Sequence, residues 1–262
     1  MASSFLFIPW FKLEAIEIAG PLALQPFGLL VASGILMGIR MAHRRAQATG
    51  VDAALLDDFI THTLLSGFIF GHMFDTVLYY PEKLTEAPLE LFMPWLGMSS
   101  FGGFFGAILG GFLWKWRRGE NLLPPLDACA FGMPLAWAFG RSGCFVVHDH
   151  PGRVTDFFLA VDGYRYGAEP FEPRHDLGLY EVFWSLACLA IFALLAKKPR
   201  PAGFFMGMLA ILYAPVRFGL DFLRVGDAVY TLGLTPGHFS AVISLALGML
   251  VLRAAYRTAA TE

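Results

Sequence analysis

The stretch GRSGCFVVHDHPGR, residues 140–153, places charged and titratable side chains directly after an apolar run. Arg141 can hold a phosphate through two parallel hydrogen bonds, because its guanidinium group is planar. The adjacent Gly140 and Gly143 would let such an anion approach the backbone. A lone arginine at this place could simply extend its charge into water. That alternative does not explain Arg141 together with Arg153 and two histidines, so we predict an anion site here.

The two histidines, His148 and His150, flank Asp149. Two histidines separated by one residue can ligate a metal from a loop, and the aspartate could join them. The spacing is unspecific and only His175 offers a further ligand, so we predict that no metal is bound. We instead expect one histidine to act as a general base and Asp149 to orient or charge its neighbour. The alternative is that these histidines are solvated loop residues without a chemical role.

The three cysteines show no metal-binding spacing. Cys129 and Cys188 lie inside apolar runs and fit buried hydrophobic positions. Cys144 follows Arg141 by three residues, and a nearby cation can make a thiol reactive by favouring its thiolate form. The simpler interpretation is that Cys144 is a small residue that fills space.

Two further segments carry arginines. Arg217, Asp221 and Arg224 are spaced so that they share one helix face. They form either an ion pair that orders the helix end or a cationic site, because two arginines outnumber one aspartate. Arg174 lies shortly before Glu181, a carboxylate that needs a partner, and is the candidate for it. We expect both segments to converge with the first stretch on one anion pocket.

The composition indicates which elements hold these residues. Of the 262 residues, 56% are hydrophobic and 15% are charged, and the mean hydropathy is +0.58. Soluble domains carry about 25% charged residues. We therefore predict an all-α integral membrane protein that forms a single domain over residues 1–262. The net charge of −2 and the lack of a basic tail argue against a nucleic-acid partner.

A transmembrane helix needs about 20 predominantly apolar residues, and seven stretches meet this requirement. The predicted spans are residues 21–42, 56–79, 98–116, 124–143, 179–196, 203–222 and 236–253. Basic residues follow the first, third, fifth and seventh spans, whereas the segment between the second and third is acidic. Because cytoplasmic loops are the basic ones, the N-terminus is expected outside and the C-terminus in the cytoplasm.

This topology makes residues 144–178 a small external head, whose glycines and prolines are typical of irregular structure. The N-terminal segment around Trp10 is expected to lie at the outer membrane interface. The glycine-rich segment 97–111 is expected to pack closely against another helix. Ser99, at its outer end, could also face the pocket.

Several segments, taken in order, resemble those of prolipoprotein diacylglyceryl transferases. They are GPLALQPFGLLVASG, GMSSFGGFFG, GRSGCFVVHDHPGR, PRHDLGLYE, KPRPAG, RFGLDFLR and GHFSAVISLALG, and together they cover nearly the whole chain. The resemblance implies an enzyme of the bacterial inner membrane with its active site on the outer side. Such an enzyme transfers the diacylglyceryl group of phosphatidylglycerol to the lipobox cysteine thiol of an exported prolipoprotein. A thioether forms and glycerol phosphate leaves.

The resemblance implies no cofactor, and we expect a monomer that works within the lipid bilayer. Arg141 matches the arginine of the family's signature segment and Arg217 the arginine of its sixth span, while Asp149 and Asp221 stand where the family has glutamates. The expected catalytic residues are His148, His150, Asp149, Arg141 and Arg217. The expected substrate-binding residues are Arg141, Gly143, Arg153, Arg174, Arg217, Asp221, Arg224, Ser99, Gly102 and Gly103.

Some positions depart from the family pattern. Phe101 stands where the family has a histidine, Cys144 replaces an asparagine, Phe27 a tyrosine and His72 an arginine. Because phenylalanine cannot exchange a proton, we expect the histidines of the signature stretch to supply the missing group. A catalytically silent paralogue that binds phospholipid or lipoprotein precursors is the alternative, as is a transferase with a different acceptor. A histidine within hydrogen-bond reach of the cationic pocket would favour the enzyme.

Overall fold

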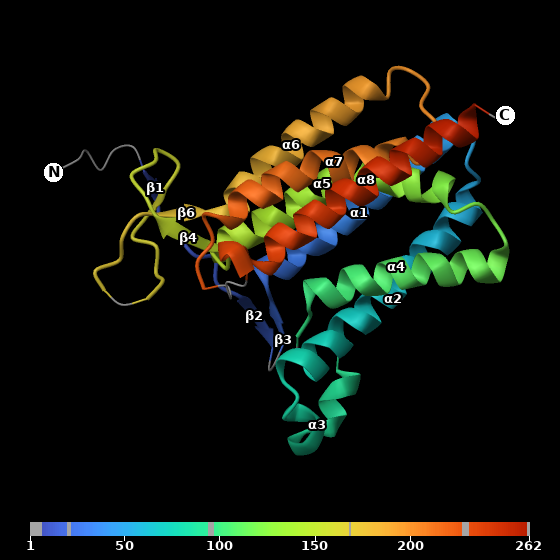
Figure 1. Cartoon of the computed structure of the whole chain (residues 1–262). Helices are drawn as coiled ribbons and strands as arrows, with labels where there is room; N and C mark the ends of the chain where they lie inside the picture. The colour runs from blue at the N-terminus through green and yellow to red at the C-terminus, as the bar shows by residue number, and fades with distance from the viewer. Residues whose placement is uncertain (1–6, 20–21, 94–96, 168, 227–230, 261–262) are drawn as a thin grey trace. The chain divides into compact units, whose positions relative to one another are not determined.

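The computed structural model describes residues 7–19, 22–93, 97–167, 169–226 and 231–260, and most of them are helical (Figure 1). The long helices are α1 (Pro26–Thr49), α2 (Ala53–Phe74), α4 (Ser100–Arg118), α5 (Leu123–Val147), α6 (Leu177–Leu195), α7 (Phe204–Asp221) and α8 (Pro236–Ala259). Each of the seven predicted spans overlaps one of these helices. A π-helical turn, Asp75–Tyr79, extends α2.

Five helices are long and apolar enough to cross a membrane: α1, α2 with its extension, α6, α7 and α8. The chain is therefore a mostly helical, multi-pass membrane protein. Among the described residues, α4 and α5 are not in this group. The count of seven spans stays a prediction.

The chain forms two compact units. The first, Met1–Ala42 with Asp127–Glu262, holds most of α1 and α5 together with α6, α7 and α8. The second, His43–Leu126, holds α2, the short α3 (Lys83–Glu86) and α4. That the whole chain acts as a single domain stays a prediction.

The expected external head contains a small β-sheet at one end of the helices of the first unit (Figure 1). Its strands are β1 (Ile8–Pro9), β5 (Val161–Asp162), β6 (Arg174–Asp176) and β4 (Pro151–Val154), in that spatial order. The pairings are antiparallel except for the parallel pair β1 and β5. Sequence analysis did not predict these strands, because two to four residues are too few to show an alternating pattern.

The N-terminal segment takes part in this sheet. β1 pairs with β5, so part of the segment expected at the membrane interface belongs to the head. A separate hairpin, β2 (Ile16–Ala19) with β3 (Leu22–Leu24), precedes α1. The head itself is shorter than predicted, since α5 continues to Val147 and α6 already begins at Leu177.

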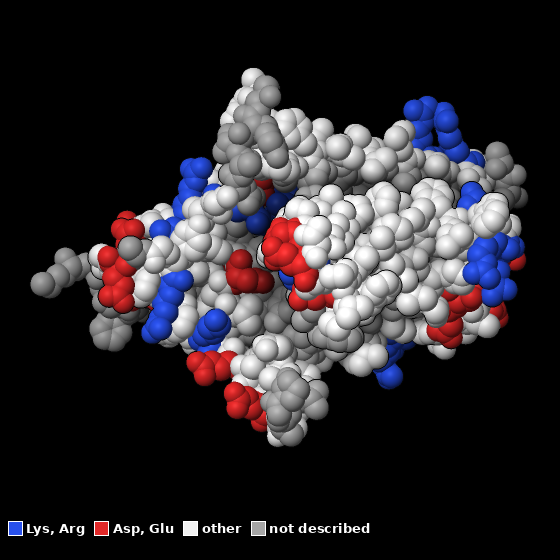
Figure 2. Space-filling model, turned by 90° about the horizontal axis from the view of Figure 1, so that it is seen from below, with Lys and Arg blue, Asp and Glu red and all other residues white. Residues whose placement is uncertain are grey.

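Large apolar side chains lie exposed along the helices. On α4, Phe104, Ile108 and Phe112 are more than half exposed, and much of the surface in Figure 2 carries no charged side chain. A surface of this kind is unfavourable in water and favourable against lipid. The first unit also has an apolar core in which Phe192 and Phe205 are fully buried and contact Cys188. The prediction that Cys188 is a buried hydrophobic residue is confirmed.

The glycine-rich segment packs closely against a neighbouring helix, as predicted. A Cβ atom at Gly106 of α4 would overlap the carbonyl oxygen of Ser66 on α2. The same constraint recurs in the first unit, where a Cβ at Gly248 of α8 would lie 2.9 Å from the carbonyl oxygen of Gly207 on α7. Small residues at these crossings let the helix backbones approach each other.

We expect Gly106→Ala to lower the free energy of unfolding by about 1–3 kcal/mol, because the added methyl group forces α4 away from α2. Gly103→Ala is the matched control on the same helix, since its Cβ would meet nothing closer than 3.9 Å. The control should be neutral or slightly stabilising. Thermal unfolding of both variants in detergent measures the difference. Equal stability of the two variants would contradict the close crossing.

Candidate active site

A buried ion pair joins α5 to α6. Arg141, two turns before the end of α5, places its Nε 2.9 Å from Oε2 of Glu181 on α6. The Glu181 side chain is only 1% exposed, and the hydroxyl group of Tyr213 on α7 donates to the same oxygen at 3.2 Å. A buried carboxylate is stable only when it is paired in this way. The pair therefore fixes the position of the Arg141 guanidinium.

The expected partner of Glu181 was wrong. Arg174 instead donates from Nη1 to the carbonyl oxygen of Gly152 at 3.1 Å, and its guanidinium lies over the ring of Tyr166. Arg174 belongs to β6 and Gly152 to β4, and these two strands pair in the head. Sequence proximity misled the prediction, because the strand carries Arg174 away from the helix that follows it.

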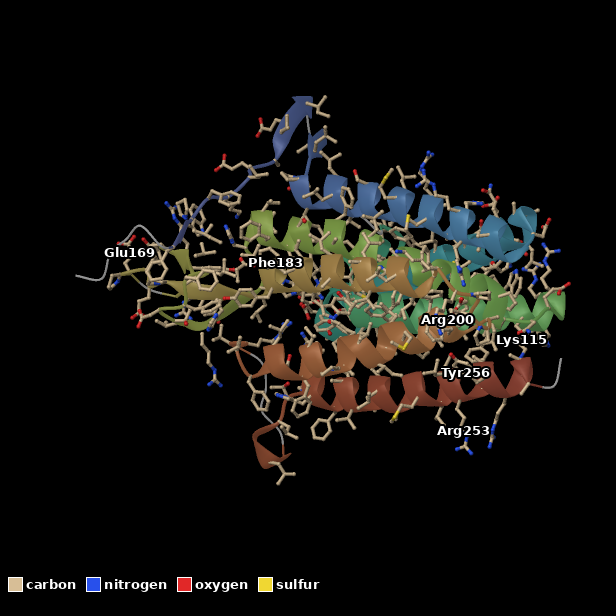
Figure 3. All side chains as sticks on the ribbon, turned by 90° about the horizontal axis from the view of Figure 1, so that it is seen from above. Lys115, Glu169, Phe183, Arg200, Arg253 and Tyr256 are labelled. Carbon is tan, nitrogen blue, oxygen red and sulfur yellow. The ribbon has the colours of Figure 1, made fainter. Side chains whose placement is uncertain are left out.

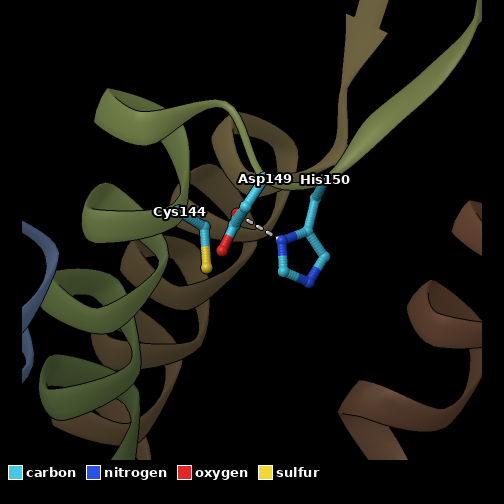
Figure 4. Close-up of side chains that lie close together, drawn as sticks. All are labelled: Cys144, Asp149 and His150. Carbon is cyan, nitrogen blue, oxygen red and sulfur yellow. Dashed lines mark hydrogen bonds and ion pairs between the residues drawn. The ribbon is translucent and has the colours of Figure 1, made fainter. Parts of the chain in front are cut away.

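The Nη1 end of the Arg141 guanidinium faces the loop that follows α5, residues 148–150. Its Nη1 lies 3.4 Å from Nε2 of His150 and 3.8 Å from Sγ of Cys144. The other ring nitrogen of His150, Nδ1, lies 2.5 Å from Oδ1 of Asp149 (Figure 4). A neutral ring that donates from Nδ1 to the carboxylate keeps its Nε2 lone pair toward the guanidinium. A histidine thus lies within hydrogen-bond reach of the cationic pocket, which favours an enzyme over a silent paralogue.

A left-handed residue at the end of α5 brings these side chains together. His148 has a φ of 53°, a conformation in which histidine is tolerated better than most residues. The N–H of Asp149 reaches back to the carbonyl oxygen of Cys144 at 3.4 Å. This six-to-one bond is the usual way to end a helix around a left-handed residue. It turns the chain so that Asp149 lies over the last turn of α5.

The two histidines of the stretch are separated by this turn. His148 is buried, its Nδ1 lies 2.8 Å from Oδ2 of Asp176, and its ring stacks on Trp10. The hydroxyl group of Tyr164 donates to the His148 carbonyl oxygen at 2.9 Å. Burial, together with the nearby Asp176 carboxylate, raises the pKa of Tyr164 well above its usual range, so this group stays a donor. His148 is therefore part of the core of the head. Of the two histidines, it is His150 that contacts Arg141.

Trp10 packs within the head, and its expected place at the membrane interface stays a prediction. Besides packing on His148, it lies under the guanidinium of Arg165, which is 4.4 Å from the ring centroid. This cation–π contact and the strand β1 attach the N-terminal segment to the head.

A second charged cluster lies at the end of α7. Arg217 Nη2 is 2.7 Å and Arg224 Nε is 3.4 Å from the same oxygen, Oδ1 of Asp221. The other oxygen of Asp221 accepts a hydrogen bond from the hydroxyl group of Thr235 and lies 3.5 Å from Nδ1 of His238. The ion-pair interpretation of this segment is confirmed. The cationic interpretation stays a prediction.

The residues of these clusters that were not predicted from the sequence include Tyr213, Asp176, Thr235 and His238. His238 could have been found from the sequence, because a threonine three residues before it has the spacing of a capping box. In the structure Thr235 is the N-cap of α8 and His238 is the N3 residue of this capping box. Asp176 likewise caps α6 by accepting from the N–H of Leu179 at 3.0 Å. Tyr213 carried no signal, since a tyrosine within an apolar span is ordinary.

The three arginine-bearing segments converge within the first unit. Gly152 and Arg224 form a β-bridge, and the N–H of Arg153 donates to the carbonyl oxygen of Leu223 at 2.7 Å. A cavity of about 280 Å³ lies at this junction, and its lining includes Arg153, Arg224, Asp221 and the missed His238. The cavity brings Arg153 of the first stretch beside Arg224, whereas Arg141, Arg174 and Arg217 are not among its lining residues. That the three segments form one anion pocket stays a prediction.

His175 does not join either cluster of charges. Its Nδ1 lies 2.7 Å from the hydroxyl group of Tyr180. Burial lowers the pKa of His175, so its ring is neutral at neutral pH and adds no charge to the pocket.

Three expected substrate contacts lie in the second unit. Ser99 caps α4 by accepting from the N–H of Gly102 at 3.4 Å, and Gly102 packs against α2. A Cβ atom at Gly103 would have no neighbour closer than 3.9 Å. His72, which stands where the family has an arginine, is buried, and its two ring nitrogens lie within hydrogen-bond distance of the carbonyl oxygens of Gly97 and Glu90. These residues have structural roles within their own unit, and a substrate role stays a prediction.

Two further residues that differ from the family pattern, Phe27 and Phe101, lie in the described part of the chain. Phe27 lies in the first unit against Gly143, where an added Cβ would be 3.0 Å from the phenylalanine ring. Gly143 therefore provides the space that this aromatic ring occupies. Phe101 on α4 is 58% exposed.

One group of side chains in the described part of the chain has the donor types and spacing to hold a metal ion. Cys144, Asp149 and His150 each offer a donor atom, and these atoms lie within 4.8 Å of one another (Figure 4). The pair of histidines considered from the sequence is not formed, because His148 is engaged with Asp176.

Comparison with known proteins agrees with the geometry. Residues 14–254 match the sequence profile of the family described as prolipoprotein diacylglyceryl transferase. A protein of Janthinobacterium sp. (strain Marseille) is 33% identical over 91% of this chain and 93% of its own length. A protein of Photobacterium profundum is 33% identical over 87% and 86%, and one of Cupriavidus pinatubonensis is 32% identical over 93% and 89%.

All three relatives are named phosphatidylglycerol–prolipoprotein diacylglyceryl transferase. The match covers both units and includes the loop that carries Arg141 as well as the end of α7. The chain therefore belongs to the prolipoprotein diacylglyceryl transferase family.

Proposed function

We propose that the protein transfers the diacylglyceryl group of phosphatidylglycerol to the lipobox cysteine of exported prolipoproteins. The names of its relatives supply the lipid donor and the protein acceptor. The observation that carries the proposal for this chain is the position of Arg141, which is fixed by a buried carboxylate on one side and faces His150 on the other. Phosphate binding and proton transfer can therefore occur at one place.

The charges of the first unit support an outward-facing site. Arg200, after α6, and Arg253, near the end of α8, lie at the opposite end of these helices from Glu169 of the head (Figure 3). Because basic ends face the cytoplasm, the head is on the periplasmic side of the inner membrane and the C-terminus is cytoplasmic. On this basis we propose an external N-terminus. Seven spans and a monomer stay predictions.

Arg141 and Arg217 are the residues that we assign to the phosphate of the lipid. Glu181 holds Arg141 through Nε, which leaves its terminal nitrogens for an anion. Arg217 is held in the same way, with its Nη2 2.7 Å from Oδ1 of the buried Asp221. These cations stabilise the negative charge that develops on the leaving phosphate oxygen. Arg153, which lines the cavity at the end of α7, then serves to position the headgroup.

The acceptor thiol must lose a proton, because a free thiol is mostly protonated at neutral pH. We assign this proton to Nε2 of His150, whose ring is oriented by Asp149. Arg141 covers that nitrogen at 3.4 Å, and a phosphate that binds the guanidinium would uncover it. The sulfur then attacks the glycerol carbon, the carbon–oxygen bond breaks, and its electron pair leaves with glycerol phosphate.

The second candidate is a paralogue that binds phospholipid without transfer. The residues that differ from the family pattern favour this binding protein. The contact between His150 and Arg141 favours the enzyme. Incubation of the purified protein with phosphatidylglycerol and a lipobox peptide distinguishes the two. Mass spectrometry should detect a thioether-linked diacylglyceryl peptide. Bound phospholipid without that product would identify a binding protein.

We expect Arg141→Ala to slow product formation per folded protein by about 10²–10³-fold, because one cation that stabilises the leaving phosphate is lost. The rate is normalised to folded protein, because this variant also leaves the buried Glu181 carboxylate unpaired. Arg141→Lys should recover only part of the rate, since an ammonium group cannot form the two parallel hydrogen bonds. Arg165→Ala is the control, because this exposed arginine contacts Trp10 in the head and should transfer at the wild-type rate. An unimpaired Arg141→Ala enzyme would contradict the assignment.

The two histidine variants should differ in kind. His150→Ala should slow transfer by about 10²-fold or more without loss of stability, because the proton acceptor is removed. His148→Ala should instead lower the free energy of unfolding by roughly 1–3 kcal/mol, because Asp176 loses its buried partner. Rates normalised to folded protein and thermal unfolding separate these effects. Full activity in the double variant His148→Ala/His150→Ala would refute a histidine base.

A further inference from the structure

Cys144, Asp149 and His150 form a compact group of three different metal-ligand types (Figure 4). The thiol comes from the last turns of α5, and the other two side chains come from the loop after it. The left-handed turn at His148 folds this loop back, so the donor atoms of all three lie within 4.8 Å of one another. A bound ion could draw them together with small side-chain rotations.

The donor set selects the class of ion. Thiolate, imidazole and carboxylate are the protein ligands of Zn²⁺, whereas Mg²⁺ and Ca²⁺ prefer oxygen donors alone. Three protein ligands leave one tetrahedral position open, as in zinc sites that exchange ligands with solvent. The ion can reach the group from water, because the side chains of Asp149 and His150 are 41% and 24% exposed.

The charge of the neighbourhood also permits a dication. The Arg141 guanidinium is adjacent, but it is paired with the buried Glu181 carboxylate. Binding would release the thiol proton to solvent, so that a thiolate and a carboxylate together offset the two charges of Zn²⁺. With Zn²⁺ bound, Cys144, Asp149 and the ion would together carry no net charge, and the adjacent ion pair of Arg141 and Glu181 also carries none.

We propose that Cys144, Asp149 and His150 bind one Zn²⁺ ion and that this ion inhibits the protein. Inhibition rests on the proposed function, because the ion engages the imidazole and carboxylate that we assign to proton transfer. Zinc binding itself does not depend on that function. The site would make transfer sensitive to the free zinc concentration on the outer side of the membrane.

Binding is tested on the full-length protein in lipid nanodiscs, by competition for Zn²⁺ with a chromophoric chelator. We expect one zinc ion per chain and a loss of affinity of more than about tenfold in Cys144→Ser. Cys129→Ser is the matched control, because Cys129 lies about four turns earlier on the same helix and should bind zinc like the wild type. Equal zinc affinity in Cys144→Ser and the wild type would overturn the site.

A labelling experiment on the wild type needs no variant. Bound Zn²⁺ should slow the alkylation of Cys144, read by peptide mass spectrometry, and leave the labelling of Cys129 unchanged. Unchanged labelling of Cys144 at saturating zinc would also overturn the site.

Inhibition is tested by the transfer assay at increasing free Zn²⁺. Wild-type product formation should fall by about tenfold or more and return when the ion is chelated. Cys144→Ser should transfer without zinc and resist its addition, which also controls for zinc bound by the acceptor thiol itself. Zinc that activates, or inhibits both proteins equally, would overturn the inhibitory role. A protein that binds zinc through Cys144 but never transfers would refute the proposed function and leave the metal site standing.

Discussion

The ion pair between Arg141 and Glu181 is the interaction on which the rest of the site depends. Glu181 is buried within the helices, where an unpaired carboxylate would cost several kcal/mol. Its pairing with Arg141 and the hydroxyl group of Tyr213 ties α5, α6 and α7 together at the level of the head. The guanidinium that is needed to satisfy the carboxylate is thereby held where it can also meet a phosphate.

The cluster around Asp221 repeats this arrangement at the end of α7. One buried carboxylate holds two arginines, and the hydroxyl group of Thr235 donates to its other oxygen from the start of α8. His238 lies beside it and accepts from the N–H of Thr235. In both clusters a carboxylate that is inaccessible to solvent fixes guanidinium groups that are partly accessible. Pairing with a buried acid fixes each guanidinium group and leaves part of its surface accessible.

The head sheet joins the two clusters. β4 carries Gly152 and Arg153 from the loop after α5 to the end of α7, through the bridge to Arg224 and the bond to Leu223. The core of the head around His148 and Asp176 supports this strand. The small β-structure therefore places Arg153 beside Arg224 at the end of α7.

The sequence by itself determined the membrane class, the approximate helices and the residues that carry charge to the site, because hydropathy, residue type and local spacing are properties of short segments. It identified the packing role of the glycine-rich segment. It also singled out Arg141 and Arg217, whose role at the lipid phosphate stays a prediction. The partners were decided only by the tertiary structure. Glu181 pairs with Arg141 rather than Arg174, because packed helices bring distant residues closer than neighbours in the chain. His148 and His150 have different environments, because a single left-handed residue at a helix end turns one ring into the head and the other toward Arg141.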